Sequence, residues 1–268
     1  MVNKEQQAIE KRHQENLERL RGMRPMDDTF MRCLFKDNIE LTELVLRIIL
    51  SKQDLSVTQI ETQADMKRVT GARSICLDAA ATDAVGTKYD IEIQRATDGA
   101  RPKRARYHAS VLDIENLDAG HEFEELPTTY TIFITENDVY AKGEPVYIIE
   151  SINITTGELF DDCKHIIYVN GAYEGDSEIG KLMHDFRSSD PEDMYYDVLK
   201  RKSEYLKNSE EGVMHMCKIM EEALEQEARE TRVVDIRNLM EEMKLTAEQA
   251  MKALRIPQNE QDSYKKLI

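Results

Sequence analysis

Short apolar and alternating segments recur through the first two thirds of the chain and predict a β-sheet. The clearest is 88–94, in which Tyr89, Ile91 and Ile93 alternate with charged or amide side chains. A period of two is typical of a half-buried strand with its polar face in water. Similar segments rich in β-branched and aromatic residues predict further strands at 55–62, 74–81, 129–135, 145–153 and 165–173. The last two are candidates for a pair at the edge of the sheet.

Helical patterns precede and follow these strands. The charged stretch 3–21 predicts a helical arm, and 39–50 carries apolar residues at helical spacing. From about residue 176 the pattern changes to helices, with Asp190-Pro191 and the capping box Thr246-Ala-Glu-Gln249 as helix starts. The order of elements therefore predicts a mixed α/β core followed by a helical region.

A helix over about 101–117 lies between the third and fourth predicted strands. Spacings of three and four place Arg104, Tyr107 and His108 on one face, together with apolar residues one turn further on. We expect the apolar end of this face to pack on the sheet. Its N-terminal end would then bring Arg104, Tyr107 and His108 towards the strand end that carries Glu92.

Composition describes a globular protein and narrows its partners. Of the 268 residues, 41% are hydrophobic and 33% are charged, which is typical of a water-soluble protein with much helical surface. Lys and Arg number 36 and Asp and Glu 52, so the net charge is −16. This balance argues against a general nucleic-acid binder, because such proteins are normally basic.

One segment departs from this acidity. Five basic residues stand against the single acid Asp98 between 95 and 108, namely Arg95, Arg101, Lys103, Arg104 and Arg106. This cationic stretch begins directly after the alternating strand that carries Glu92 and Gln94. A local cluster of positive charge suits a substrate with a phosphate backbone. A solvated basic helix face is the ordinary alternative.

The cysteines and the apolar segments indicate the cellular compartment of the protein. The four cysteines are scattered without a CxxC pair, and neither Cys163 near His165 nor Cys217 near His215 has zinc-knuckle spacing. We interpret them as reduced thiols. The N-terminus has no apolar signal segment and no run of eighteen apolar residues occurs, so we expect a cytoplasmic protein without membrane spans.

Two carboxylates are the main candidates for chemistry. Asp78 closes a short apolar run, a turn-like segment follows at 82–87, and Glu92 lies in the alternating strand. Two strands joined by a tight turn would place Asp78 beside Glu92. Converging carboxylates repel each other unless a cation lies between them, and hard oxygen ligands suit Mg²⁺ or Mn²⁺. Acidic residues on the wet face of an edge hairpin are the alternative.

Glu40 is the candidate for a third carboxylate. At 100° per residue it falls on the flank of the apolar stripe in 39–50, whereas Glu43 falls on the wet side. An acid at the border of a buried stripe can reach towards a neighbouring sheet. An ordinary boundary glutamate is the favoured alternative.

The order helix, three strands, helix, strand, with Asp on the second strand and Glu-x-Gln on the third, resembles the PD-(D/E)XK nuclease superfamily. More narrowly, the chain resembles the Rpn family, the recombination-promoting nucleases often classed as transposases. The resembling segments are Phe30-Met-Arg-Cys-Leu-Phe35, Leu77-Asp78, 86–94, Lys103-Arg-Ala-Arg-Tyr-His108, 120–134 and the hairpin at 246–257. The resemblance therefore covers nearly all of the chain from about residue 25.

This resemblance implies a restriction-endonuclease-like α/β fold, in which helices flank a mixed sheet and a helical extension follows. It implies DNA as the substrate, with Asp78 and Glu92 as ligands of Mg²⁺ or Mn²⁺. Gln94 stands where most of the superfamily has lysine. An amide dipole orients water or phosphate but lacks the positive charge of lysine, so the metal must supply most of the charge stabilisation. The chain also departs from the family's pattern at His108, which follows Tyr107 at a place where the family usually has a pair of aromatic residues.

Three functions fit these features. The first is a metal-dependent DNA endonuclease linked to recombination or mobile elements, in which a metal-activated water attacks phosphorus in line. The second is a non-catalytic interaction module on the same scaffold, favoured by the net charge and the missing lysine. The third is an RNA-directed nuclease, because the metal chemistry does not distinguish the two sugars.

The residues and boundaries that follow from the first hypothesis are specific. Its predicted catalytic residues are Asp78, Glu92, Gln94 and Glu40, and its predicted DNA contacts are Arg101, Lys103, Arg104, Arg106 and Tyr107. The predicted regions are a charged arm at 1–24, a nuclease domain at 25–175 and a helical region at 176–268. The oligomeric state is left open, a homo-oligomer included.

Overall fold

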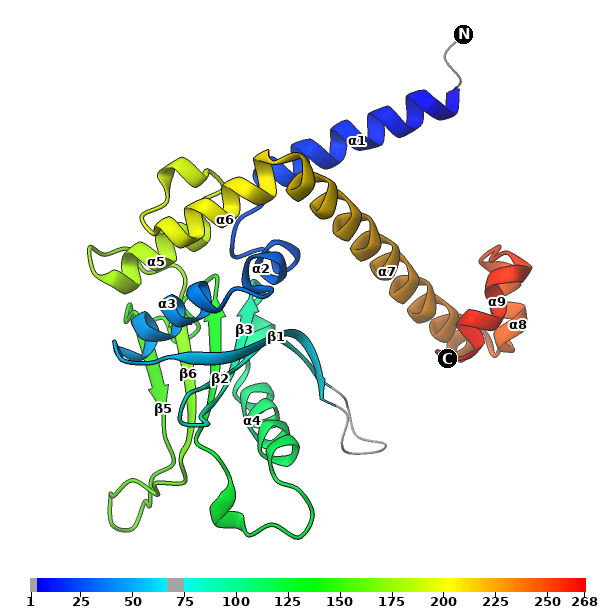
Figure 1. Cartoon of the computed structure of the whole chain (residues 1–268). Coiled ribbons are helices and arrows are strands. Elements are labelled where there is room, and N and C mark those ends of the chain that lie inside the picture. The colour runs from blue at the N-terminus through cyan, green and yellow to red at the C-terminus, as the bar shows by residue number, and fades with distance from the viewer. Residues whose placement is uncertain (1–3, 67–74) are drawn as a thin grey trace. The chain divides into compact units, whose positions relative to one another are not determined.

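The computed structural model describes residues 4–66 and 75–268 (Figure 1). Contacts between Cα atoms divide the chain into two compact units, Met1–Met216 and Cys217–Ile268. The first unit contains the whole sheet. It also contains α5 (Glu178–Arg187) and α6 (Asp197–Asn208), the first two helices of the predicted helical region at 176–268. None of the described helices combines the length and the hydrophobicity that a membrane span requires.

The sheet confirms the mixed α/β class. Its six strands lie in the order β1 (Val57–Met66), β2 (Ile75–Asp83), β3 (Lys88–Gln94), β4 (Thr129–Thr135), β6 (Lys164–Asn170) and β5 (Val146–Ile149). The first three strands pair antiparallel, β4 and β6 add in parallel, and β5 closes the edge antiparallel to β6. All six predicted strands are present, and the later pair lies at the edge. Ser74, the predicted start of the second strand, lies outside the described residues.

Helices cover both faces of this sheet (Figure 1). One face packs against α2 (Asp28–Phe35) and α3 (Ile39–Leu50), and the other packs against α4 (Pro102–Asn116). Helix α3 begins where its sequence predicts, because the Asn38 side chain accepts a hydrogen bond from the backbone N–H of Leu41. Helix α4 has proline in its first turn, where a missing N–H costs nothing.

Strand β3 corrects one expectation. Its alternation predicted a polar face in water, but its five central residues are all buried. Asp90 and Glu92, on the polar face, are 0% and 1% exposed. The physical reason is that α4 lies over this face, so that His108 packs against Asp90 and against the ring of Phe133 on β4. The sheet is thus buried on both sides where the acids lie.

The first helix, α1 (Lys4–Gly22), is anchored at its C-terminal end. The ammonium group of Lys207, on α6, donates hydrogen bonds to the backbone carbonyls of Arg21, Met23 and Ser189. Burial lowers the pKa of Lys207 to about 8, and the carbonyls and the ring of Phe30 compensate its charge. The predicted charged helix therefore exists, and its last turn is tied to α6 within the first unit.

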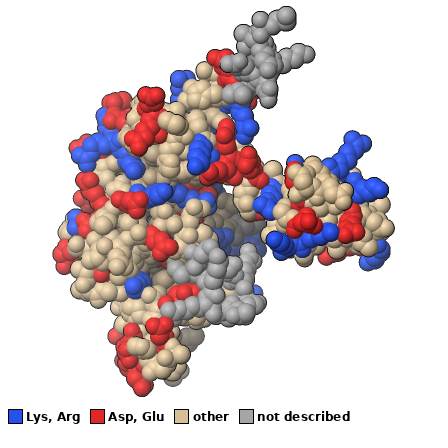
Figure 2. Space-filling view, turned by 45° about the vertical axis from the view of Figure 1, so that its right-hand side comes forward, with Lys and Arg blue, Asp and Glu red and all other residues tan. Residues whose placement is uncertain are grey.

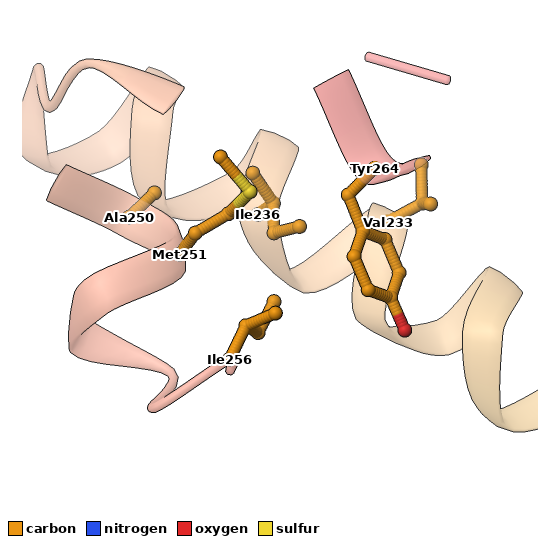
Figure 3. Close-up of a cluster of buried hydrophobic side chains, with 6 residues drawn as sticks. All are labelled: Val233, Ile236, Ala250, Met251, Ile256 and Tyr264. Carbon is orange, nitrogen blue, oxygen red and sulfur yellow. The ribbon is translucent and has the colours of Figure 1, made fainter. Parts of the chain in front are cut away.

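The second unit is helical and has its own core (Figure 3). Helix α7 (Glu210–Met243) enters the unit at Cys217, and α8 (Ala247–Ala253) and α9 (Gln258–Lys265) follow. Six buried side chains meet between them, Val233, Ile236, Ala250, Met251, Ile256 and Tyr264. The predicted capping box is present, with Thr246 and Gln249 bonding each other's backbone.

Candidate metal centre

The two predicted carboxylates lie side by side. The ladder between β2 and β3 ends at the pair Ala79 and Ile91, and the next positions outward are Asp78 and Glu92. Their side chains take over the hydrogen bonds of the ladder. The Asp78 N–H donates to Glu92 Oε1 at 3.1 Å, and the Ile93 N–H donates to Asp78 Oδ2 at 3.0 Å. Each carboxylate is therefore oriented by the other residue's strand.

Asp90 and His108 complete a cluster that the sequence argument did not assign. Asp90 lies two positions before Glu92 and so on the same face of β3. His108 Nδ1 lies 3.1 Å from Asp90 Oδ2 and 3.9 Å from Glu92 Oε1. One ligand atom from each of these three residues falls within 4.8 Å of the others. The same period of two that singled out Glu92 was the signal for Asp90, while His108 had been expected only to face this strand end.

Arg104 fixes the protonation of His108. Its guanidinium approaches Glu92 Oε2 at 3.4 Å with one nitrogen and His108 Nε2 at 3.4 Å with another. Because a guanidinium only donates, Nε2 must accept, and the imidazole proton lies on Nδ1, which donates to Asp90. Burial also lowers the pKa of His108. The contact with Asp90 is therefore a hydrogen bond from a neutral imidazole.

The carboxylates hold protons tightly. Burial raises the pKa of Asp78 to about 6 and of Asp90 to about 8, and burial together with the neighbouring acids Asp90 and Asp78 raises that of Glu92 to about 9. Asp90 Oδ1 is buried and has no hydrogen-bond partner among the described residues. An unsatisfied buried oxygen beside two further carboxylates fits a divalent cation. Asp78, Glu92 and Asp90 offer the oxygen ligands that Mg²⁺ or Mn²⁺ prefers, with the imidazole of His108 beside them.

Gln94 lies at the end of β3, with its amide nitrogen 3.5 Å from Glu92 Oε2. Its amide oxygen packs against Gly99, in the short 3-10 helix η1 (Thr97–Ala100). A Cβ at Gly99 would collide with Gln94 Oε1. Glycine at position 99 therefore leaves room for the amide oxygen of Gln94, while the amide nitrogen lies near Glu92.

Glu40 is not part of this cluster. Its side chain is 66% exposed and pairs with Arg201 of α6 at 3.1 Å. The residue lies in the first turn of α3, where it faces α6 and solvent instead of the strand ends. The charge of Asp28, on α2, contributes to the raised pKa of Asp78, after burial as the main cause.

The predicted DNA contacts lie along the N-terminal half of α4. Arg101, Lys103, Arg104 and Arg106 are exposed, and Tyr107 is half-buried. Arg104 connects this row to the carboxylates through its contact with Glu92. The row of exposed cations on α4 therefore lies next to the buried carboxylates, with Arg104 part of the row and in contact with Glu92.

The family model described as PD-(D/E)XK nuclease family transposase matches residues 36–255. The chain belongs to this family. Comparisons with curated proteins and with solved structures found no match. Membership of a PD-(D/E)XK family confirms the resemblance that the order of strands and the motifs had indicated, and the fold agrees with it. It points to a nuclease-related or transposase-related function and to a divalent metal as cofactor.

Proposed function

We propose that this PD-(D/E)XK protein is a divalent-metal-dependent endonuclease that hydrolyses phosphodiester bonds in DNA, in recombination or in the movement of genetic elements. The observation that carries the proposal is the buried acid cluster with the unsatisfied Asp90 oxygen, next to an exposed row of cations on α4. The family supports the reaction class.

The side chains have separate roles in this proposal. Asp78 and Glu92 would hold the cation, with Asp90 as a further oxygen donor. A bound divalent cation would supply Lewis acidity for the activation of water and for the charge that develops on phosphate. The amide of Gln94 would orient water or a phosphate oxygen, and Arg104 would place its charge against the phosphate. His108 would hold Asp90 in place through its Nδ1–H.

A non-catalytic interaction module is the second candidate. The amide of Gln94 in place of a lysine charge and the net charge of −16 favour it. A carboxylate cluster at the end of two neighbouring strands favours catalysis, because burying three acids together is costly without a cation. The two candidates differ in whether the protein turns over substrate.

A plasmid-nicking assay decides between them. Wild-type protein is incubated with supercoiled plasmid and Mg²⁺ or Mn²⁺, beside Asp78→Asn purified in parallel and a structured RNA as second substrate. Conversion of supercoiled to nicked plasmid by the wild type alone supports the endonuclease. Cleavage of RNA without plasmid nicking changes the substrate class, and no cleavage of either leaves the interaction module.

Substitutions of Gln94 test how the site works with an amide at the position where most of the superfamily has lysine. If the amide only orients water or phosphate, Gln94→Lys should retain or raise cleavage, because it adds a charge near the developing negative charge. Gln94→Ala should lower cleavage about tenfold or more, a loss of one positioning contact. Initial nicking rates at saturating metal measure both. An inactive Gln94→Lys with unchanged metal binding would show that the amide makes a contact which lysine cannot copy.

The cations of α4 give a salt-dependent test. The affinity of a protein with this net charge for duplex DNA should fall steeply as the salt concentration rises. The expected slope is about −0.9 in log K against log salt for each phosphate contact. Arg104→Ala should reduce the magnitude of the slope by about one unit. Arg201→Ala is the matched control, since Arg201 is another exposed arginine of the same unit, on α6. An equal loss in both variants would remove α4 as the contact surface.

A further inference from the structure

The C-terminal unit contains two short helices across a tight turn. Helix α8 ends at Ala253, four residues form the turn, and α9 begins at Gln258. The backbone of Arg255 is left-handed, with φ of 56°, and the N–H of Ile256 donates to the carbonyl of Met251. The side chain of Gln261 donates to the Ile256 carbonyl at 3.0 Å. The direction of α9 relative to α8 is therefore fixed by hydrogen bonds at the turn.

A shared core holds both helices on α7. Figure 3 shows Met251 of α8, Ile256 of the turn and Tyr264 of α9 beside Val233 and Ile236 of α7. All five of these side chains are less than a tenth exposed, and so is the small side chain of Ala250. Two short helices joined by a four-residue turn and packed on a third helix have the order of elements and the turn length of a helix-turn-helix, a motif whose second helix lies in the DNA major groove.

The outer face of α9 carries side chains that can read base edges. Gln258, Asn259, Asp262, Lys265 and Lys266 are exposed, whereas Tyr264 faces the core. Amides of Gln and Asn pair with adenine, and Lys pairs with guanine, in the major groove. A cleft of about 560 Å³ lies between α8 and α9, and Lys252, Arg255 and Gln258 are among the residues that line it.

The charge of this hairpin contrasts with that of the chain. From Lys244 to Ile268 there are five basic and three acidic residues, although the whole chain is at −16. The three acids are all paired, Glu248 and Asp262 with Lys265 at 2.8 and 3.8 Å, and Glu260 with Arg232 at 3.6 Å.

Several cations of the hairpin are left uncompensated, Lys252 and Arg255 among them. Lys252 and Arg255 form no ion pair with any residue in the described part of the chain. Figure 2 shows cationic side chains on the surface of this unit. The hairpin therefore presents free positive charge in a protein that is otherwise strongly acidic.

We propose that the α8–α9 hairpin is a second DNA-binding surface, with α9 in the major groove of a duplex and Lys252 and Arg255 on the phosphate backbone. The surface lies in a different unit from the acid cluster. It would hold the chain on duplex DNA whether or not the metal centre cleaves, and exposed Gln258 and Asn259 would give it a preference among sequences.

Binding of the full chain to a short fluorescent duplex, measured by anisotropy in EDTA over a series of salt concentrations, tests the proposal. The double variant Lys252→Gln/Arg255→Gln should weaken binding about tenfold or more and reduce the magnitude of the salt slope by about two units. The matched control is Lys11→Gln/Lys218→Gln, which removes the same charge from two exposed helical lysines. This control should bind like the wild type.

A second variant separates groove contacts from general attraction. Gln258→Ala/Asn259→Ala should keep the salt slope and reduce the difference in affinity among duplexes of different sequence. Unchanged circular-dichroism melting establishes that each variant is folded. The proposal is overturned by wild-type binding in Lys252→Gln/Arg255→Gln, by an equal loss in the charge control, or by a preference for single-stranded RNA over the duplex.

The outcome is independent of the endonuclease assay. A protein that cleaves nothing but binds duplex through Lys252 and Arg255 supports the hairpin and ends the endonuclease proposal. If instead the wild type nicks plasmid and Lys252→Gln/Arg255→Gln binds duplex like the wild type, the endonuclease proposal is supported and the hairpin proposal is overturned.

Discussion

Plasmid nicking by Asp78→Asn and by Glu92→Gln is expected to fall by about a thousandfold or more, a loss of roughly 4 kcal/mol in transition-state stabilisation. Each change keeps the shape of the side chain and removes one negative charge from the cluster. The amides can still take part in the hydrogen bonds between the Asp78 N–H and Glu92 and between the Ile93 N–H and Asp78. The loss should therefore arise from cation binding and not from unfolding.

Two glutamates serve as comparisons in the same assay. Glu158→Gln removes one charge from an exposed hairpin, and its rate should equal that of the wild type. Glu40→Gln tests the third candidate carboxylate, and the exposed ion pair with Arg201 leads us to expect activity close to wild type. Equal nicking by Asp78→Asn, Glu92→Gln and wild type would reveal a contaminating nuclease.

The free energy of unfolding in EDTA is expected to fall as the pH rises from about 5 to about 9. Unfolded Asp and Glu titrate near 4. In the folded protein, burial raises the pKa of Asp78 to about 6, of Asp90 to about 8 and of Glu92 to about 9. The folded state therefore binds more protons than the unfolded state in this range. The contribution to stability is fully present below pH 4 and is lost as the pH passes the folded values.

Replacing Glu92 by glutamine should remove part of this loss. At pH 8 in EDTA, Glu92→Gln should raise the free energy of unfolding by about 1–3 kcal/mol, because it relieves charge repulsion and desolvation. Urea unfolding at several pH values measures the effect, with Glu158→Gln as the control that should follow the wild type. Mn²⁺ should stabilise the wild type at pH 8 and stabilise Glu92→Gln much less, since only binding to the folded state adds stability. A variant less stable than the wild type at every pH would contradict the argument.

Local sequence determined the strands and much of the site. Strict alternation in β3 placed Asp90, Glu92 and Gln94 on one face, and the turn before it brought Asp78 opposite Glu92. These relations depend on a period of two and on a short connection, both of which are properties of neighbouring residues. The same locality explains why the ends of β3 and β4 were predicted to the residue.

Tertiary structure decided what surrounds those residues. The period of two gave β3 a polar face, but only the packing of α4 across the sheet shows that this face is buried, with His108 on Asp90 and Arg104 on Glu92. Likewise, the helical stripe placed Glu40 at a boundary, and only the packing of α6 beside α3 places it with Arg201. Burial and raised carboxyl pKa values depend on contacts between segments distant in sequence. A local pattern shows which side a residue faces, but it does not show which element lies opposite.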